Sequence, residues 1–320
     1  MQQKGDMKPR DPEELPALTR EYVESRRTRD ASASTNTGKE KPYGADPLAT
    51  APGFVLHILA SGSKGNAAIV RFGDTAILID CGISKKEFLA RCDIVGFDPT
   101  TLSAVLITHE HSDHTKGLGV VMRGLAKLDV RPALYTTNAI IAASAPIREI
   151  EPLVTLRRIT TRQDFSVAGV RIMSFPTSHD SVESMGFHFE SSKPNKNKID
   201  TLGYVTDTGF LSDEARAMLK DCRLLALESN HDPHLLEIGP YPTALKRRVA
   251  GNEGHLSNEQ AAKALEALLS NHLEQIAGMH LSETNNLPRS CETALADILA
   301  RNNHPASMWA ASQHRPLTLQ

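Results

Sequence analysis

The sequence has few of the features that mark secreted, disulfide-bonded or membrane proteins. Its four cysteines are far apart and include no CxxC pair: Cys81, Cys92, Cys222 and Cys291. This spacing argues against a disulfide framework or a thiolate metal site and is typical of a reducing compartment. The first residues contain no apolar segment of the kind that a secretory signal needs, and no stretch is long and apolar enough to span a bilayer. We therefore expect a cytoplasmic protein with no membrane partner.

Net charge and aromatic side chains are also scarce. The formal net charge is -2, and aromatic residues make up 5% of the chain, with Trp309 as the single tryptophan. A nucleic-acid partner would need a local group of Lys and Arg. Two segments are candidates, Lys246-Arg247-Arg248 and Lys193 to Lys198, although both also fit ordinary solvated segments. With so few aromatics, such a partner would be recognised by its backbone and ends, with little sequence preference.

The chain divides into three parts by composition. Residues 1–53 are rich in charged and small polar residues and are predicted to be a disordered N-terminal tail, because they cannot bury enough apolar surface to offset chain entropy. Residues 54–301 alternate apolar strands with amphipathic helices, and residues 302–320 are predicted to be a C-terminal tail. Strands are expected near 54–59, 67–72, 75–80, 104–108, 170–175, 185–190, 202–207, 223–228 and 275–280. Helices are expected near 84–92, 115–128, 212–220, 241–249, 258–270 and 289–301.

The most informative segment is His109-Glu110-His111-Ser112-Asp113-His114, directly after the apolar run 104–108. His109 and His111 are two positions apart and can reach one ion from an extended turn, whereas Asp113 and His114 diverge toward a second position. Nitrogen and oxygen donors in this arrangement suit two neighbouring metal ions, and two-metal sites are usually hydrolytic. The plainer alternative is a polar loop that happens to be rich in histidine.

The segment Ile107 to His114 resembles the metal motif of the metallo-β-lactamase fold, an α/β (α+β) four-layer αββα sandwich whose members are mostly dinuclear hydrolases. The remaining motifs of that fold follow in order. Asp80 matches an aspartate that orients metal-bound histidines, His179 matches the third histidine of one metal site, Asp207 matches the bridging carboxylate, and His280 matches the last ligand of the second site. The ligand set that the resemblance implies is His109, His111, Asp113, His114, His179, Asp207 and His280.

Each of these later residues also has a simpler interpretation. His179 and His280, taken singly, could be ordinary exposed or hydrogen-bonded histidines. Asp207 precedes Thr-Gly and could be a turn residue. Asp80 could cap a helix that begins near Ser84. The order of the motifs and their positions at strand ends favour the metal site.

Five strings narrow the resemblance to the YycJ-type (WalJ-type) branch of this fold, small proteins regarded as nucleases. They occur in order across most of the chain: Ala60 to Asn66, Glu228 to Asp232, Tyr241 to Lys246, Gly254 to Asn258, and His280 to Asn286. Membership of this branch implies an exonuclease that acts on DNA from the 5′ end. The expected partner is thus a nucleic acid, DNA in particular, bound without strong sequence preference.

Phosphodiester cleavage needs an activated water, charge neutralisation at the phosphoryl oxygens and a proton for the leaving alkoxide. Two ions bridged by a hydroxide nucleophile supply the first two, and Asp113 is counted among the catalytic residues as well as the ligands. His255 is the candidate proton donor, because it lies in a glycine-entered turn and neither metal set needs it. The same turn matches a capping box, Ser257 to Gln260, and the cap and an anion site can coincide at a helix N-terminus.

Other polar residues are candidates for substrate binding or support. The glycine-containing stretch between the first two strands offers Ser61, Ser63, Lys64 and Asn66, which could hold a phosphate or could simply form a hairpin turn. Asn230 and Ser257 could line the same rim. His231 could support the metal site from behind the ligands, as we expect of Asp80, or be hydrogen-bonded nearby.

Two other functions remain open from the sequence alone. A glyoxalase-type thioester or ester hydrolase would use the same ligand set but would have little cause to keep His255 in its turn. A non-catalytic, metal-binding regulatory protein is disfavoured by the complete ligand set. Imidazole and carboxylate ligands accept zinc, manganese or iron, so two divalent ions of unspecified identity are the expected cofactors.

Overall fold

The computed structural model describes residues 53–191 and 199–320. The predicted N-terminal tail, apart from Gly53, and the whole basic segment from Lys193 to Lys198 lie outside the described residues. No helix in the described ranges is long and apolar enough to cross a bilayer.

Within the described ranges, the strands form two seven-stranded sheets. The first sheet has the order β14-β1-β2-β3-β4-β5-β6, with strands β1 Val55–Ala60, β2 Ala67–Phe72, β3 Thr75–Ile79, β4 Ala104–Leu106, β5 Ala133–Thr136, β6 Thr155–Arg158 and β14 Leu317–Leu319. The second has the order β13-β12-β11-β10-β9-β8-β7, with β7 Asp164–Val167, β8 Val170–Pro176, β9 Met185–Ser191, β10 Thr201–Val205, β11 Leu224–Glu228, β12 Gln275–Met279 and β13 Ser307–Ala310.

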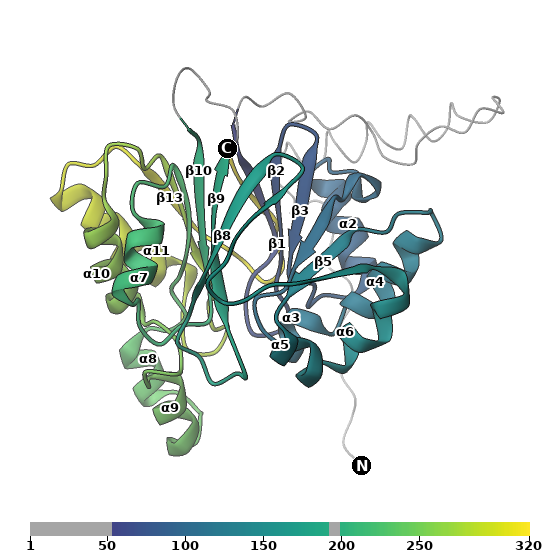
Figure 1. Ribbon diagram of the computed structural model, residues 1–320. Helices are drawn as coiled ribbons and strands as arrows, with labels where there is room; N and C mark the ends of the chain where they lie inside the picture. Colours follow the sequence, from purple (N-terminus) through teal and green to yellow (C-terminus); the bar gives the residue numbers. More distant parts are fainter. Residues whose placement is uncertain (1–52, 192–198) are drawn as a thin grey trace, which may run out of the picture. The chain divides into compact units, whose positions relative to one another are not determined.

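Helices cover the outer face of each sheet, which gives the predicted four-layer αββα arrangement (Figure 1). One outer layer contains α2 Lys85–Ile94, α3 Ser112–Thr115, α4 Leu118–Ala126, α5 Asn138–Ala143 and α6 Ala145–Ile150. The other contains α7 Asp213–Leu219, α8 Pro233–Ile238, α9 Thr243–Val249, α10 Asn258–Leu268 and α11 Pro288–Arg301. Two short 3-10 turns, η2 Pro99–Thr101 and η3 Glu151–Leu153, complete the described helical elements.

The central strands are apolar because both of their faces are covered. Every residue of β1, β3 and β11 is buried, as expected for strands between a helix layer and a second sheet. One core cluster fills the space between the sheets and includes Phe187 and Tyr204, and a second lies beneath α10 and α11 around Leu265 and Leu295. Burial of these side chains fixes the sheets, and the sheets in turn fix the positions of the strand ends.

The prediction that residues 302–320 form a C-terminal tail is wrong. β13 pairs in parallel with β12, where Gly278 faces Ala310, and β14 pairs antiparallel with β1, where Leu56 faces Leu319. The segment therefore supplies an edge strand to each sheet. Strands of four and three residues are too short to show a clear alternation, and for this reason the pattern did not reveal them.

The helix predicted over 115–128 also differs from the structure. It is divided into α3, which begins at Ser112, and α4, which begins at Leu118. Asp113 and His114 therefore lie on a short helix rather than in an extended loop. A separate prediction, that Asp80 could cap the next helix, is excluded, because Ser84 forms the capping box of α2 with Glu87.

Candidate metal centre at the strand ends

The predicted ligands are brought together because they follow strands that end at the same edges. β3 and β4 are parallel, as are β10, β11 and β12. Asp80 directly follows β3 and His280 directly follows β12, while Asp207 and His179 come a few residues after β10 and β8. The carboxyl ends of parallel strands are the usual place for a site in a sheet with this topology.

Three of these residues have left-handed backbone conformations. The φ angles are 57° for Asp80, 54° for Asp207 and 56° for His280. A non-glycine residue in this region is uncommon, although Asp and His tolerate it better than most, and such a conformation costs about 1–3 kcal/mol. Three such residues at the ends of three strands indicate that the surrounding structure holds them there for a functional reason.

The seven predicted ligands form two groups that meet at Asp207. The first group is His109, His111 and His179, and the second is Asp113, His114 and His280; within each group the ligand atoms lie within 4.8 Å of one another. Asp207 places Oδ2 at 3.3 Å from His114 Nε2 and Oδ1 at 3.8 Å from His179 Nε2. The geometry therefore offers two adjacent ligand sets with a shared carboxylate.

Asp80 orients two of the histidines. His114 donates from Nδ1 to Asp80 Oδ2 at 2.8 Å. The Thr108 hydroxyl donates to the same oxygen at 2.8 Å and accepts from Nδ1 of His109 at 2.9 Å. Because both Nδ1 atoms are donors in this network, Nε2 of each ring is the atom that faces the centre and would bind an ion.

Two further histidines are oriented in the same way. His179 Nδ1 donates to the carbonyl of Gly254 at 3.2 Å, and His280 Nδ1 donates to Glu228 Oε1 at 3.2 Å. The fully buried Nε2 of His109 has no hydrogen-bond partner within the described part of the chain. A buried nitrogen lone pair without a donor is costly unless a cation binds it. The donor set therefore fits divalent metal ions.

The centre also carries buried negative charge. Burial would raise the pKa of Asp113, but His114 and His280 hold it well below its usual range. Burial acts in the same direction on Asp207, and His280 and His114 again hold its pKa well below the ordinary value. Burial would lower the pKa of His280, whereas Asp207, Asp113 and Glu228 raise it to about 10. Both Asp207 and Asp113 are thus anionic at neutral pH and would attract a cation.

Glu228 is a site residue that sequence reasoning missed. It is fully buried at the end of β11, and its Oε1 accepts from Nδ1 of His255 at 2.8 Å and from His280. Its Oε2 accepts from the backbone N–H groups of Thr208 and Leu256. Because four donors already use both oxygens, Glu228 is better placed to orient the two histidines than to bind an ion. A carboxylate that ends an apolar strand, as Asp80 does, was the available signal.

The predicted hairpin between β1 and β2 brings two of its four candidates to the centre. Ser61 Oγ accepts from the backbone N–H of His280 at 2.7 Å, and Asn66 Nδ2 lies 3.0 Å from His114 Nε2. Ser63 and Lys64 are exposed, and Lys64 forms an ion pair with Glu283. Ser61 and Asn66 are buried and support ligands, so neither is free to serve as a surface phosphate contact.

The remaining candidates are held by local hydrogen bonds. Asn230 donates to the carbonyl of His280 at 2.7 Å. Ser257 forms the predicted capping box of α10 with Gln260. His231 is buried, burial lowers its pKa to about 4, and its Nδ1 has no partner within the described ranges. His231 therefore makes no described hydrogen bond to a predicted ligand, and its supporting role stays a prediction.

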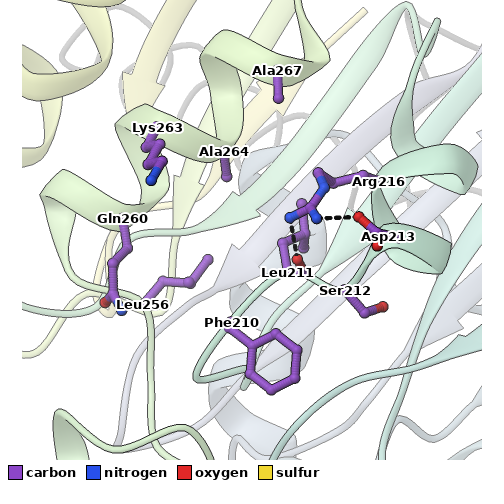
Figure 2. Close-up of a pocket in the computed structure, with 10 residues that line it drawn as sticks. All are labelled: Phe210, Leu211, Ser212, Asp213, Arg216, Leu256, Gln260, Lys263, Ala264 and Ala267. Carbon is purple, nitrogen blue, oxygen red and sulfur yellow. Dashed lines mark hydrogen bonds and ion pairs between the residues drawn. The ribbon is translucent and has the colours of Figure 1, made fainter.

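A cavity of about 690 Å³ lies between α7 and α10, apart from the ligand cluster (Figure 2). Phe210 and Leu256 line it and follow Asp207 and His255 closely in the chain, but no predicted ligand is among its described lining residues. In Figure 2 the side chain of Arg216 is hydrogen-bonded to neighbouring residues. The candidate reaction centre is therefore the cluster at the strand ends and not this cavity.

Comparisons with known proteins agree with this geometry. Residues 75–308 match the model of the β-lactamase superfamily domain. The chain is 34% identical over 253 residues to exodeoxyribonuclease YycJ of Bacillus anthracis, which covers 77% of this chain and 89% of the relative. It is 32% identical over 251 residues to exodeoxyribonuclease WalJ of Streptococcus pneumoniae serotype 2, covering 78% and 89%. The crystal structure of the metallo-β-lactamase fold protein YhfI from Bacillus subtilis superimposes with a TM-score of 0.59 at 15% identity, covering 83% of this chain and 99% of that one.

Proposed function

The chain is a hydrolytic enzyme of the β-lactamase superfamily and belongs to the family of the YycJ and WalJ exodeoxyribonucleases, and from that premise we propose that it degrades DNA from the 5′ end with two divalent metal ions. The observation that carries the proposal is the pair of ligand groups that share Asp207, next to the hydrogen-bonded pair of His255 and Glu228. The cytoplasm is the proposed compartment, since all four buried cysteines are free thiols.

The two ligand groups would each hold one ion. His109, His111 and His179 would bind the first, Asp113, His114 and His280 the second, and Asp207 both. When bound, such ions activate water and neutralise charge on the phosphoryl oxygens. Donors of nitrogen and oxygen without thiolate fit zinc, manganese or iron.

His255 is the proposed proton donor to the leaving oxygen. Its Nδ1 is committed to Glu228, so Nε2 is the atom that would carry and release a proton. The carboxylate of Glu228 fixes the orientation of the ring. Burial would raise the pKa of Glu228, but His255 and His280 lower it to about 2, so this acceptor is ionised at neutral pH. The His255 side chain is 17% exposed, which leaves it open to a substrate, whereas Glu228 is fully buried.

The orienting residues keep the ligands ready for the ions. Asp80 holds Nδ1 of His114 directly and Nδ1 of His109 through Thr108, and the carbonyl of Gly254 holds Nδ1 of His179. In each ring Nε2 is left to face the centre, where an ion would bind it. Preorganisation of this kind means that little reorganisation is needed when ions and substrate arrive.

The test is digestion of DNA labelled at either end, with added zinc, manganese or iron. We expect the 5′ label to be released at once as a mononucleotide and the 3′ label to appear only late in the digestion. The His111→Ala variant is the control for contaminating nucleases. Early release of the 3′ label would reverse the proposed polarity. Turnover of a thioester but of neither DNA nor bis(p-nitrophenyl) phosphate would exclude the nuclease altogether.

A further inference from the structure

Helices α8 and α9 lie beyond the ends of the strands of the second sheet (Figure 1). In Figure 1 they lie at the same end of the sheets as α3, which carries Asp113 and His114. No residue of α9 is buried. The helix therefore contributes little to the core, and another reason must account for its presence beside the candidate metal centre.

The loop that follows α9 is fixed directly against that centre. The carbonyl of Gly254 accepts from His179 Nδ1, and the carbonyl of Asn252 accepts from Ser178 Oγ at 2.8 Å. The backbone N–H of His255 donates to the carbonyl of Val249, the last residue of α9, at 2.9 Å. The C-terminal end of α9 is thus held beside both a predicted ligand and the proposed proton donor.

The last turn of α9 carries three consecutive basic residues, Lys246, Arg247 and Arg248. The first turn of the helix contains no acidic residue. Arg248 is 57% exposed and forms an ion pair from Nε to Asp180, whose Oδ1 is 3.5 Å from His179 Nε2. Lys246 donates to the carbonyl of Glu237 in α8. The side chain of Arg247 is exposed and forms no hydrogen bond or ion pair with the described part of the chain.

Basic residues are common at helix C-termini because they complement the helix dipole, and this alone could place cations here. The side-chain contacts point to a further role. Lys246 bonds to α8 and Arg248 to Asp180, so neither side chain caps the last carbonyls of α9. Arg248 is instead held beside the centre through Asp180, and its two terminal nitrogens form no hydrogen bond within the described ranges.

We infer that Arg247 and Arg248 bind the sugar-phosphate backbone of the nucleic-acid substrate next to the scissile bond, an inference that rests on the proposed function. The whole chain has a net charge of -2, so its overall field does not attract a polyanion. Binding of DNA therefore requires local cations. Arg247 and Arg248 lie beside the metal centre, where the proposed function places cleavage of the DNA. Arg248 binds one backbone phosphate beside the metal centre, and Arg247 binds a neighbouring phosphate of the same DNA strand.

The experiment measures DNA binding separately from cleavage. Fluorescent single-stranded oligothymidylate is titrated in EDTA with the full chain and with Arg247→Gln, Arg248→Gln and the double variant. We expect weaker binding in each variant and a salt dependence, the slope of log K against log salt, that is shallower by about 0.7 for each arginine removed. Arg301→Gln, an exposed arginine in the last turn of α11, is the matched control and should bind as the unaltered chain does.

The binding data can overturn the inference in two ways. Unchanged affinity and unchanged slope in Arg247→Gln and in the double variant overturn the inference. Equal displacement of the oligonucleotide by polyglutamate of the same charge also overturns it, because the surface would then bind any polyanion. Thermal unfolding checks that Arg248→Gln is folded, and Arg247→Gln, which breaks no described contact, carries the test if it is not. Hydrolysis of bis(p-nitrophenyl) phosphate by the unaltered chain tests the proposed function independently.

Discussion

Glu228 accepts a hydrogen bond from Nδ1 of His255 at 2.8 Å, and the two residues come from different elements, the end of β11 and the turn before α10. Glu228 is fully buried, and its other oxygen is held by two backbone N–H groups. The carboxylate cannot turn away, so His255 has a fixed ring orientation. In the proposed mechanism, Glu228 is a positioning residue that acts through His255.

Replacing His255 by Ala should leave the metal content unchanged and slow the turnover of DNA by about 10²- to 10⁴-fold, the usual range for general acid catalysis. Glu228→Gln should slow turnover less. With metal at saturation, the double variant should lose less transition-state stabilisation than the two single variants together, because residues that act as one unit are not additive. Steady-state kinetics and metal analysis provide the measurements. The positioning role is contradicted if the loss of transition-state free energy in the double variant equals the sum of the losses in the two single variants.

Asp207→Ala should reduce the binding of both metal ions, since the carboxylate lies between the two ligand groups. Metal analysis after dialysis should show fewer than one tightly bound ion per chain. The control is Asp213→Ala, which removes an exposed aspartate from the first turn of α7 and should keep the full metal content. Two tightly retained ions in the Asp207→Ala protein contradict a shared ligand.

The Thr108→Val substitution should disturb only one of the two histidines that Asp80 orients. The substitution removes the hydroxyl that connects Asp80 to His109 but leaves the direct hydrogen bond from His114 to Asp80. Loss of such an orienting partner typically lowers metal affinity by about 10- to 100-fold. We therefore expect weakening of one ion and near-normal binding of the other in a chelator competition. Equal weakening of both would show that the relay does not act on His109 alone.

The four cysteines should be unreactive in the native protein. Burial raises the pKa of Cys81 and Cys222, and it raises that of Cys291 to about 11, so thiolate is scarce at pH 8. Ellman's reagent at that pH should therefore modify the folded chain very slowly and all four thiols in guanidinium. As the pH rises toward the pKa of Cys291, its thiolate fraction grows, although burial still limits access. Rapid reaction of any thiol at pH 8 contradicts the described burial.

The sequence was informative where chemistry recurs locally and less so where contacts are distant. The run from His109 to His114 indicated a metal site, and the resemblance of the later motifs to the metallo-β-lactamase fold predicted both the fold and the convergence of Asp207 and His280 on that run. Glu228 was missed because its partners lie in the turn before α10 and at the end of β12, and spacing along the chain does not reveal them. The shortness of the two strands in residues 302–320 likewise concealed them, since each is stabilised by pairing with a strand distant in the sequence.

The last residues of the chain should also affect the metal centre through Gln313. Its Oε1 accepts from the backbone N–H of Lys64 at 2.9 Å, and its Nε2 donates to the carbonyl of Gly65 at 2.8 Å. Those two bonds hold the hairpin that carries Asn66 against His114. Gln313→Ala should destabilise the fold by about 1–3 kcal/mol, because it removes the partner of the buried Gly65 carbonyl and of the partly buried Lys64 N–H, and should weaken metal binding. Denaturant unfolding in EDTA measures the first effect and chelator competition the second. His314→Ala, which removes only an exposed contact with Glu283, is the control, and equal losses in the two variants would refute a specific role for Gln313.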